Sequence, residues 1–171
     1  MNKLLGSKKL ARVSSTQGRT RAVNYFVVDD RFYFVDLPGY GWAKAGKDER
    51  RQWAALIDRY LRSESGSRHV VQLVDAKVGV TALDEQAHEF FCSLGHRPSV
   101  VATKIDRLPR GRRGASLAAV TRDLALGDQR PIAFSARSGE GVKELWSAIH
   151  SFLRSPQGSA ASEESYEQDQ P

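Results

Sequence analysis

Val35-Asp36-Leu37-Pro38-Gly39, Thr103-Lys104-Ile105-Asp106 and Phe134-Ser135-Ala136 are the three stretches that decide the fold. Each lies at the end of an apolar run typical of a β-strand, and helical patterns separate most of these runs. Such alternation predicts an α/β domain with a mostly parallel sheet and one antiparallel edge strand. Ligands bind at the carboxyl ends of parallel strands, so we expect the three stretches to share one site.

The elements around these stretches are predicted from apolar spacing. Asp29-Asp30 separates two β-branched and aromatic runs, which predicts a hairpin. Thr81 with Asp84 predicts a capping box at the start of a helix. Residues 70–74 form an apolar run interrupted only by Gln72, which we interpret as a strand buried on both faces. The expected strands are 22–28, 31–35, 70–74, 99–102 and 132–134, and the expected helices are 48–61, 81–94, 115–126 and 141–153.

Length and composition are those of a globular domain. The 171 residues fit one domain, and 40% hydrophobic content suffices for a core. No apolar run approaches the roughly 18 residues of a membrane span, and residues 1–10 hold too short an apolar stretch for a secretory signal. We therefore expect a cytoplasmic protein, and we expect it to be a monomer. The single Cys92 excludes an intramolecular disulfide, and its apolar neighbours predict a buried core thiol.

Charge is unevenly distributed along the chain. Residues 155–171 hold four acids and no Lys or Arg, which predicts a disordered acidic tail. Without those four acids, the net charge of +6 becomes +10 on residues 1–154. The basic excess gathers between Lys8 and Arg21 and between Arg107 and Arg113. An RNA partner accounts for these clusters, and so does a solvated surface that balances the charge of a bound nucleotide.

The first stretch has the residue types of a phosphate and metal site. Asp36 could hold Mg2+ through water, and Pro38-Gly39 lets the backbone turn so that the Gly39 amide faces a γ-phosphate. The alternative is a plain turn at the end of a strand, because Asp-x-Pro-Gly is a common turn composition.

The second and third stretches have the residue types of a guanine site. Asp106 can accept hydrogen bonds from N1 and the exocyclic amino group of guanine, donors that adenine does not present, while the stem of Lys104 lies over the base. Ser135-Ala136 offers backbone amides to the guanine carbonyl oxygen. The alternative for the second stretch is a loop in which Asp106 caps a helix.

These stretches, together with Lys8-Lys9-Leu10-Ala11-Arg12 and Gly18-Arg19-Thr20, resemble the EngB family of GTPases, also called YihA or YsxC. The similarity runs from about Asn2 to Leu153. It implies a Ras-like P-loop GTPase domain over residues 1–154. It also implies binding of GTP or GDP with Mg2+, a role in assembly of the large ribosomal subunit through contact with that subunit or its RNA, and a role in cell division and septation.

Carried over position by position, the resemblance assigns a nucleotide site. Thr20 would be the switch threonine on Mg2+, and it is the one metal ligand assigned; no catalytic residue is assigned. The expected GTP-binding residues are Gly18, Arg19, Thr20, Arg21, Ala22, Asp36, Leu37, Pro38, Gly39, Thr103, Lys104, Ile105, Asp106, Phe134, Ser135 and Ala136.

The sequence contains no G-x-x-x-x-G-K-[ST] phosphate loop. Residues 1–6 resemble the end of the helix that follows this loop in the family, so we expect Met1 to be an internal methionine and the first strand and phosphate loop to be absent. Burying four or five side chains of that strand would contribute roughly 1.5–3 kcal/mol each, comparable with a whole domain's stability of about 5–15 kcal/mol. We therefore expect the chain as written to be poorly soluble and not to bind GTP.

For the intact protein, the resemblance implies phosphoryl transfer from GTP to water. Tyr40 directly follows Asp36 to Gly39, where many GTPases carry a water-orienting glutamine. We therefore expect slow intrinsic hydrolysis, with a partner or a monovalent cation completing the site. The competing hypothesis is a basic RNA-binding or ribosome-binding module that keeps the motifs as scaffold and turns over no nucleotide.

Overall fold

A computed structural model describes residues 1–6, 23–37, 39, 47–62 and 67–155, and its chain divides into two compact units. One unit comprises Met1–Arg12 and His69–Ser151, and the other comprises Val13–Arg68 and Phe152–Pro171. Several predicted features lie outside the described residues. They are the acidic tail beyond Ser155, the segment Gly18 to Ala22, which includes Thr20, and the single residues Pro38 and Tyr40.

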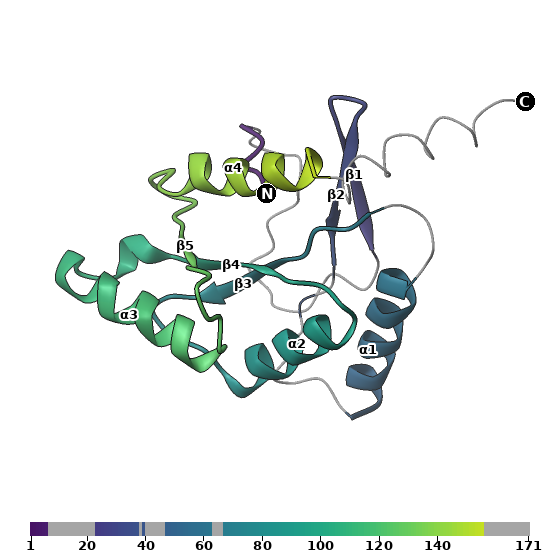
Figure 1. Ribbon diagram of the computed structural model, residues 1–171, viewed down its shortest axis with the longest axis horizontal. Helices are drawn as coiled ribbons and strands as arrows, with labels where there is room; N and C mark the ends of the chain where they lie inside the picture. The colour runs from purple at the N-terminus through teal and green to yellow at the C-terminus, as the bar shows by residue number, and fades with distance from the viewer. Residues whose placement is uncertain (7–22, 38, 40–46, 63–66, 156–171) are drawn as a thin grey trace, which may run out of the picture. The chain divides into compact units, whose positions relative to one another are not determined.

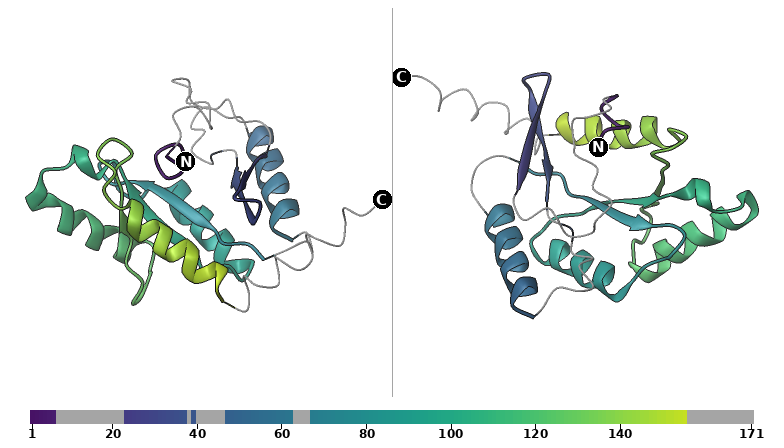
Figure 2. Two further views of the ribbon diagram at one scale, coloured as in Figure 1. Left: turned by 90° about the horizontal axis from the view of Figure 1, so that it is seen from above. Right: turned by 180° about the vertical axis from the view of Figure 1, so that it is seen from behind.

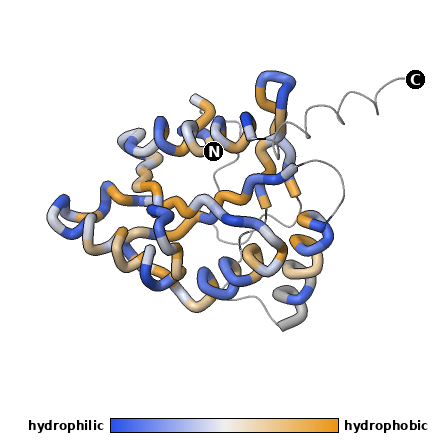
Figure 3. The backbone as a smooth tube through the Cα atoms, in the orientation of Figure 1, coloured by the Kyte–Doolittle hydropathy of each residue, from blue (hydrophilic) through white to orange (hydrophobic). Residues whose placement is uncertain are grey.

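The first unit is built on a three-stranded parallel sheet of order β3-β4-β5 (Figure 1). Apolar runs form these strands, as the orange segments of the tube show (Figure 3). The central strand is the most buried, because Val100, Val101 and Ala102 are at most 1% exposed. The strands are β3 (Val71–Asp75), β4 (Ser99–Thr103) and β5 (Ile132–Ala133), with Val71 paired to Ser99 and Val101 paired to Ile132.

Three helices cover this sheet. The helices α2 (Ala82–Ser93) and α3 (Arg110–Asp123) lie on one side of it, and α4 (Val142–Leu153) lies on the other (Figures 1 and 2). The predicted capping box at α2 is confirmed, because Thr81 and Asp84 exchange side-chain and backbone hydrogen bonds. Val120 and Leu124 of α3 pack against Val74 and Val100 of the sheet.

The second unit contains the predicted hairpin, which is confirmed. Strands β1 (Asn24–Val28) and β2 (Phe32–Asp36) pair in antiparallel fashion. Asp29 and Asp30 both have a φ of 50°, the positive value that the tight hairpin turns require and that Asp tolerates. Helix α1 (Lys47–Arg62) also belongs to this unit, and it buries Ile57 and Leu61.

Three local expectations were wrong. Helix α3 begins at Arg110 rather than at Ala115, in spite of the two glycines of its first turns. Strand β3 is not buried on both faces, because Leu73 is 58% exposed while Gln72 and Val74 face inward. Cys92 is exposed rather than buried, because α2 buries Ala87 and Phe91 and the next residue points about 100° away around the helix.

Gln72 shows how β3 tolerates a polar residue in its buried face. Its amide nitrogen donates to the carbonyl oxygen of Asp84 at 2.8 Å, and its amide oxygen lies 2.7 Å from Nδ1 of His88. These bonds join β3 to α2 and satisfy a side chain that is 2% exposed.

Candidate functional site

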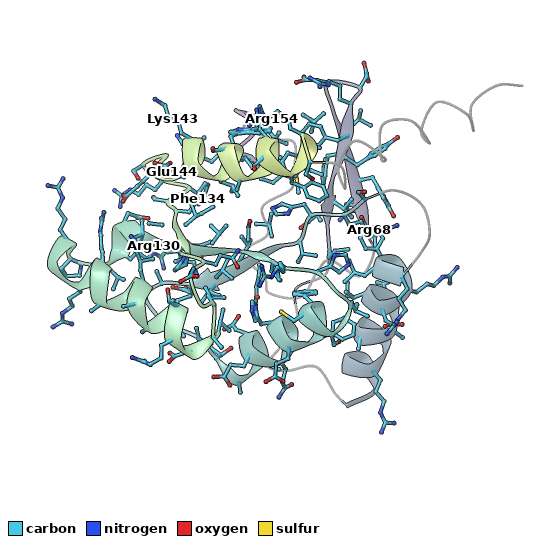
Figure 4. All side chains as sticks on the ribbon, viewed as in Figure 1. Arg68, Arg130, Phe134, Lys143, Glu144 and Arg154 are labelled. Atoms are coloured by element: carbon cyan, nitrogen blue, oxygen red, sulfur yellow. The ribbon has the colours of Figure 1, made fainter. Side chains whose placement is uncertain are left out.

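Two of the three predicted stretches meet at one edge of the parallel sheet. Thr103 to Asp106 follow β4, and Phe134 to Ala136 follow β5, so adjacent parallel strands deliver both stretches to their carboxyl ends. The amide of Ile105 donates to the carbonyl oxygen of Phe134 at 3.2 Å, and the amide of Phe134 donates to Ala102 at 2.9 Å. The backbone therefore binds the two stretches together directly. Figure 4 labels Phe134 where β5 leads into the loop before α4.

Asp106 is a partly exposed carboxylate held in its ionised form. A hydrogen bond from the Ser135 hydroxyl lowers the pKa of Asp106, and the positive charges of Arg137 and Arg107 lower it further. An ionised carboxylate is an acceptor only, which suits it to recognise paired N–H donors. Asp106 does not cap a helix, because Lys104 precedes the short helix η1 (Ile105–Arg107) and Pro109 is the N-cap of α3.

Ser135 is the centre of the loop that follows β5. Its side chain is fully buried, and its hydroxyl oxygen accepts hydrogen bonds from the amides of Arg137 at 3.2 Å and Ser138 at 3.1 Å. Within the part of the chain that the structure describes, the intervening amide of Ala136 has no acceptor. An amide donor therefore remains available beside the Asp106 carboxylate, a pairing that complements the carbonyl oxygen and N–H groups of a guanine edge.

Lys104 is fixed by a carboxylate that the sequence prediction missed. Its backbone adopts a φ of 57°, and its amine lies 2.6 Å from Asp75 at the end of β3. Burial alone would raise the pKa of Asp75, but hydrogen bonds from Lys104 and from the amides of Lys77 and Val78 hold that pKa below its ordinary value. The signal was present in the sequence, because Asp75 also follows an apolar run at a strand end.

The other residues of these stretches have structural roles. The Ile105 side chain is fully buried and packs with Ala76 and Ala102, so only its backbone is left for a ligand. The Thr103 hydroxyl donates to the carbonyl oxygen of Val74 at 2.9 Å, which joins β4 to β3. Phe134 is buried, at 8% exposed, and it is therefore part of the hydrophobic core.

Asp36, Leu37 and Gly39 belong to the second unit. Burial raises the pKa of Asp36, which ends β2, and a hydrogen bond from the Asn24 side chain opposes this shift. Mg2+ requires an octahedron of oxygen ligands. Among the described residues no cluster of three or more His, Cys, Asp or Glu side chains could hold a metal ion, and the predicted ligand Thr20 lies outside them.

Comparisons with known proteins settle the family. A family model described as a 50S ribosome-binding GTPase matches residues 1–104. The chain is 45% identical over 160 residues to the probable GTP-binding protein EngB of Anaeromyxobacter sp. (strain Fw109-5), which covers 88% of this chain and 74% of that protein. The chain belongs to the EngB family. It is also 39% identical over 155 residues to the probable GTP-binding protein EngB of Geobacillus thermodenitrificans (strain NG80-2), covering 90% and 79% of the two chains.

Solved structures show the same fold. The crystal structure of a probable GTP-binding protein engB matches with a TM-score of 0.67 at 17% identity, covering 90% of this chain and 89% of that one. Era in complex with MgGDPNP and nucleotides 1506–1542 of 16S ribosomal RNA matches with a TM-score of 0.69 at 22% identity, covering 88% and 50%. The predicted Ras-like P-loop GTPase fold is thereby confirmed. No helix in the described ranges is long and apolar enough to span a membrane.

Proposed function

We propose that this EngB family chain binds GTP and GDP as a cytoplasmic, monomeric GTPase switch. We propose further that it acts in assembly of the large ribosomal subunit and is needed for normal cell division and septation. The names of the relatives support nucleotide binding, and the description of the family model supports a ribosomal partner.

The observation that carries the nucleotide proposal is the geometry at Asp106. An ionised acceptor and the available amide of Ala136 come from adjacent strand ends, and the hydroxyl of Ser135 links them. Adenine would leave the Asp106 carboxylate without its two donors. A site built to hydrogen-bond a base rejects analogues that lack the matching groups by a factor on the order of 10⁴.

The proposal gives each residue of the candidate site a role. Asp106 binds the N1 and amino groups of guanine, and the Ala136 amide donates to its carbonyl oxygen. Lys104 covers the base with its stem while Asp75 holds the amine. By the family resemblance, Asp36 and Gly39 are the residues expected to face the γ-phosphate. Mg2+, when bound with GTP, neutralises phosphate charge, and Thr20 and Asp36 would hold it. The position after Gly39 holds Tyr40, so we expect the chain to position water poorly and to turn over slowly.

Nucleotide titration tests this proposal. Fluorescent GDP and GTP, competed with unlabelled ATP, are titrated into the full-length protein. We expect a guanine preference on the order of 10⁴, and we expect Asp106→Ala to remove most of it. Asp128→Ala is the matched control, because Asp128 is an exposed carboxylate on another loop. Equal affinity for ATP and GTP in the unaltered protein would refute the proposal.

The same experiment separates the competing module from the switch. Protein that binds structured RNA but no guanine nucleotide would favour the basic ribosome-binding module.

A further inference from the structure

Arg113 of α3 contacts both loops of the candidate guanine site. Its Nε donates to the carbonyl oxygen of Leu108 at 3.3 Å, directly after the helix η1 that carries Asp106. Its Nη1 donates to both carboxylate oxygens of Glu140, at 3.1 and 3.0 Å, in the loop that follows β5. The side chains of Arg113 and Glu140 are 24% and 41% exposed, so water reaches the Glu140 end of the bridge more than the Arg113 end.

The Glu140 end of the bridge is tied directly to Ser135. The carbonyl oxygen of Glu140 accepts a hydrogen bond from the amide of Ser135 at 2.9 Å, and the amide of Gly139 donates to the carbonyl oxygen of Ser135 at 2.9 Å. Movement of Glu140 therefore moves the residue that holds Asp106 and leads into Ala136. Gly141, with a φ of 80°, fixes the end of this loop against Ala133.

The Leu108 end of the bridge is likewise tied directly to the turn that contains Asp106. The amide of Leu108 donates to the carbonyl oxygen of Ile105 at 3.1 Å, which closes the single turn that contains Asp106. A guanidinium is a rigid, planar group whose donors lie at fixed separations. It therefore sets the distance between the two loops, where a flexible side chain would allow that distance to vary.

We infer that Arg113 is a positioning residue for guanine selection: it sets the spacing between the Asp106 carboxylate and the Ala136 amide by bridging Leu108 and Glu140. This inference rests on the proposed nucleotide function and extends it. Arg113 touches no base itself, so its effect is on selectivity more than on phosphate affinity. Neighbouring Arg112 is exposed and has no ion pair with any described residue, so it lacks this role.

The test compares GDP with inosine diphosphate, which lacks the exocyclic amino group that Asp106 recognises. A hydrogen bond to a charged group gives a preference of about 10-fold to 100-fold for GDP in the unaltered protein. We expect Arg113→Gln to reduce that preference to within about 3-fold. Arg112→Gln removes the same charge from the same helix and should leave the ratio unchanged. A merely structural role of Arg113 would weaken both nucleotides equally, and an unchanged ratio would overturn the inference.

A second variant and a second measurement complete the test. Glu140→Ala should reduce the ratio as Arg113→Gln does, and the double variant should be no worse than the more severe single variant, because both act through one contact. Amide hydrogen exchange without nucleotide should be faster at Ser135 and Gly139 in Arg113→Gln than in Arg112→Gln. Failure of the unaltered protein to bind GDP would refute the proposed function alone, whereas equal exchange in the two variants would refute the positioning role whatever the nucleotide result.

Discussion

Replacement of Ser135 by alanine should destabilise the loop after β5 by a predictable amount. The hydroxyl accepts from the amides of Arg137 and Ser138, and the side chain is fully buried. Each neutral hydrogen bond contributes roughly 0.5–1.5 kcal/mol net, so their loss should lower the free energy of unfolding by about 1–3 kcal/mol. At roughly 2–4 °C per kcal/mol for a domain of this size, the midpoint of thermal unfolding should fall by about 2–12 °C.

The same substitution should alter the titration of Asp106. The Ser135 hydrogen bond is the largest influence that lowers the pKa of this carboxyl, so in Ser135→Ala the pKa should rise toward its ordinary value. A carboxyl whose pKa is lowered by folding adds stability above its unfolded pKa of about 4, and that stability is lost as the pH falls through the folded pKa. The stability gap between the two proteins should therefore be widest near neutral pH and should narrow in acid.

Urea unfolding at about pH 7 and about pH 3 measures both effects, and the carboxyl resonance of Asp106 followed by NMR gives its pKa directly. Ser93→Ala is the matched control, because that hydroxyl donates to a backbone carbonyl, that of Phe90, at an exposed helix end. The control should shift stability by less than about 0.5 kcal/mol. The reasoning fails if Ser135→Ala and the unaltered protein unfold at the same urea concentration at neutral pH, or if the substitution leaves the pKa of Asp106 unchanged.

Three further substitutions test other parts of the site. Gly141→Ala should destabilise by at least about 2 kcal/mol in urea unfolding, because a Cβ there would collide with the carbonyl oxygen of Ala133 and φ is positive; unchanged stability would show that the loop can shift. Ile105→Ala should cost about 2–5 kcal/mol, because the side chain is fully buried, and a loss under about 1 kcal/mol would contradict its role in the core. Asp75→Asn should lower the free energy of unfolding by less than about 1 kcal/mol, because the pair of Asp75 with Lys104 is partly exposed. The variant should also lose the part of the pH dependence of stability that Asp75 contributes below about pH 4. A pH dependence identical to that of the unaltered protein would contradict the lowered pKa of Asp75.

The strands and their order along the chain could be predicted because their signals are local. Alternation of apolar runs with helical spacing indicated the parallel sheet, and Asp29-Asp30 indicated the hairpin. The capping box at Thr81 was predictable for the same reason, since its partners are three residues apart. The meeting of Asp106 and Ser135 followed from one topological rule, because adjacent parallel strands end at the same edge.

The wrong expectation for the start of α3 depended on a contact between residues distant in sequence. The first two turns of α3 contain two glycines and no acid, yet Arg113 of this segment binds Glu140, which lies 27 positions later. The buried Gln72 finds its partners on α2, so residues 12 and 16 positions later satisfy the one polar side chain of the apolar run. Propensity and local spacing carry no information about such partners.

The exposure of Cys92 makes the protein convenient for spectroscopy. It is the sole cysteine of the sequence and it lies at the surface of α2. Within this sequence, a maleimide fluorophore would therefore attach at a single defined point, without mutagenesis. Labelled in this way, the chain becomes its own probe, in which energy transfer from Cys92 to a fluorescent guanine nucleotide would give binding rates in real time.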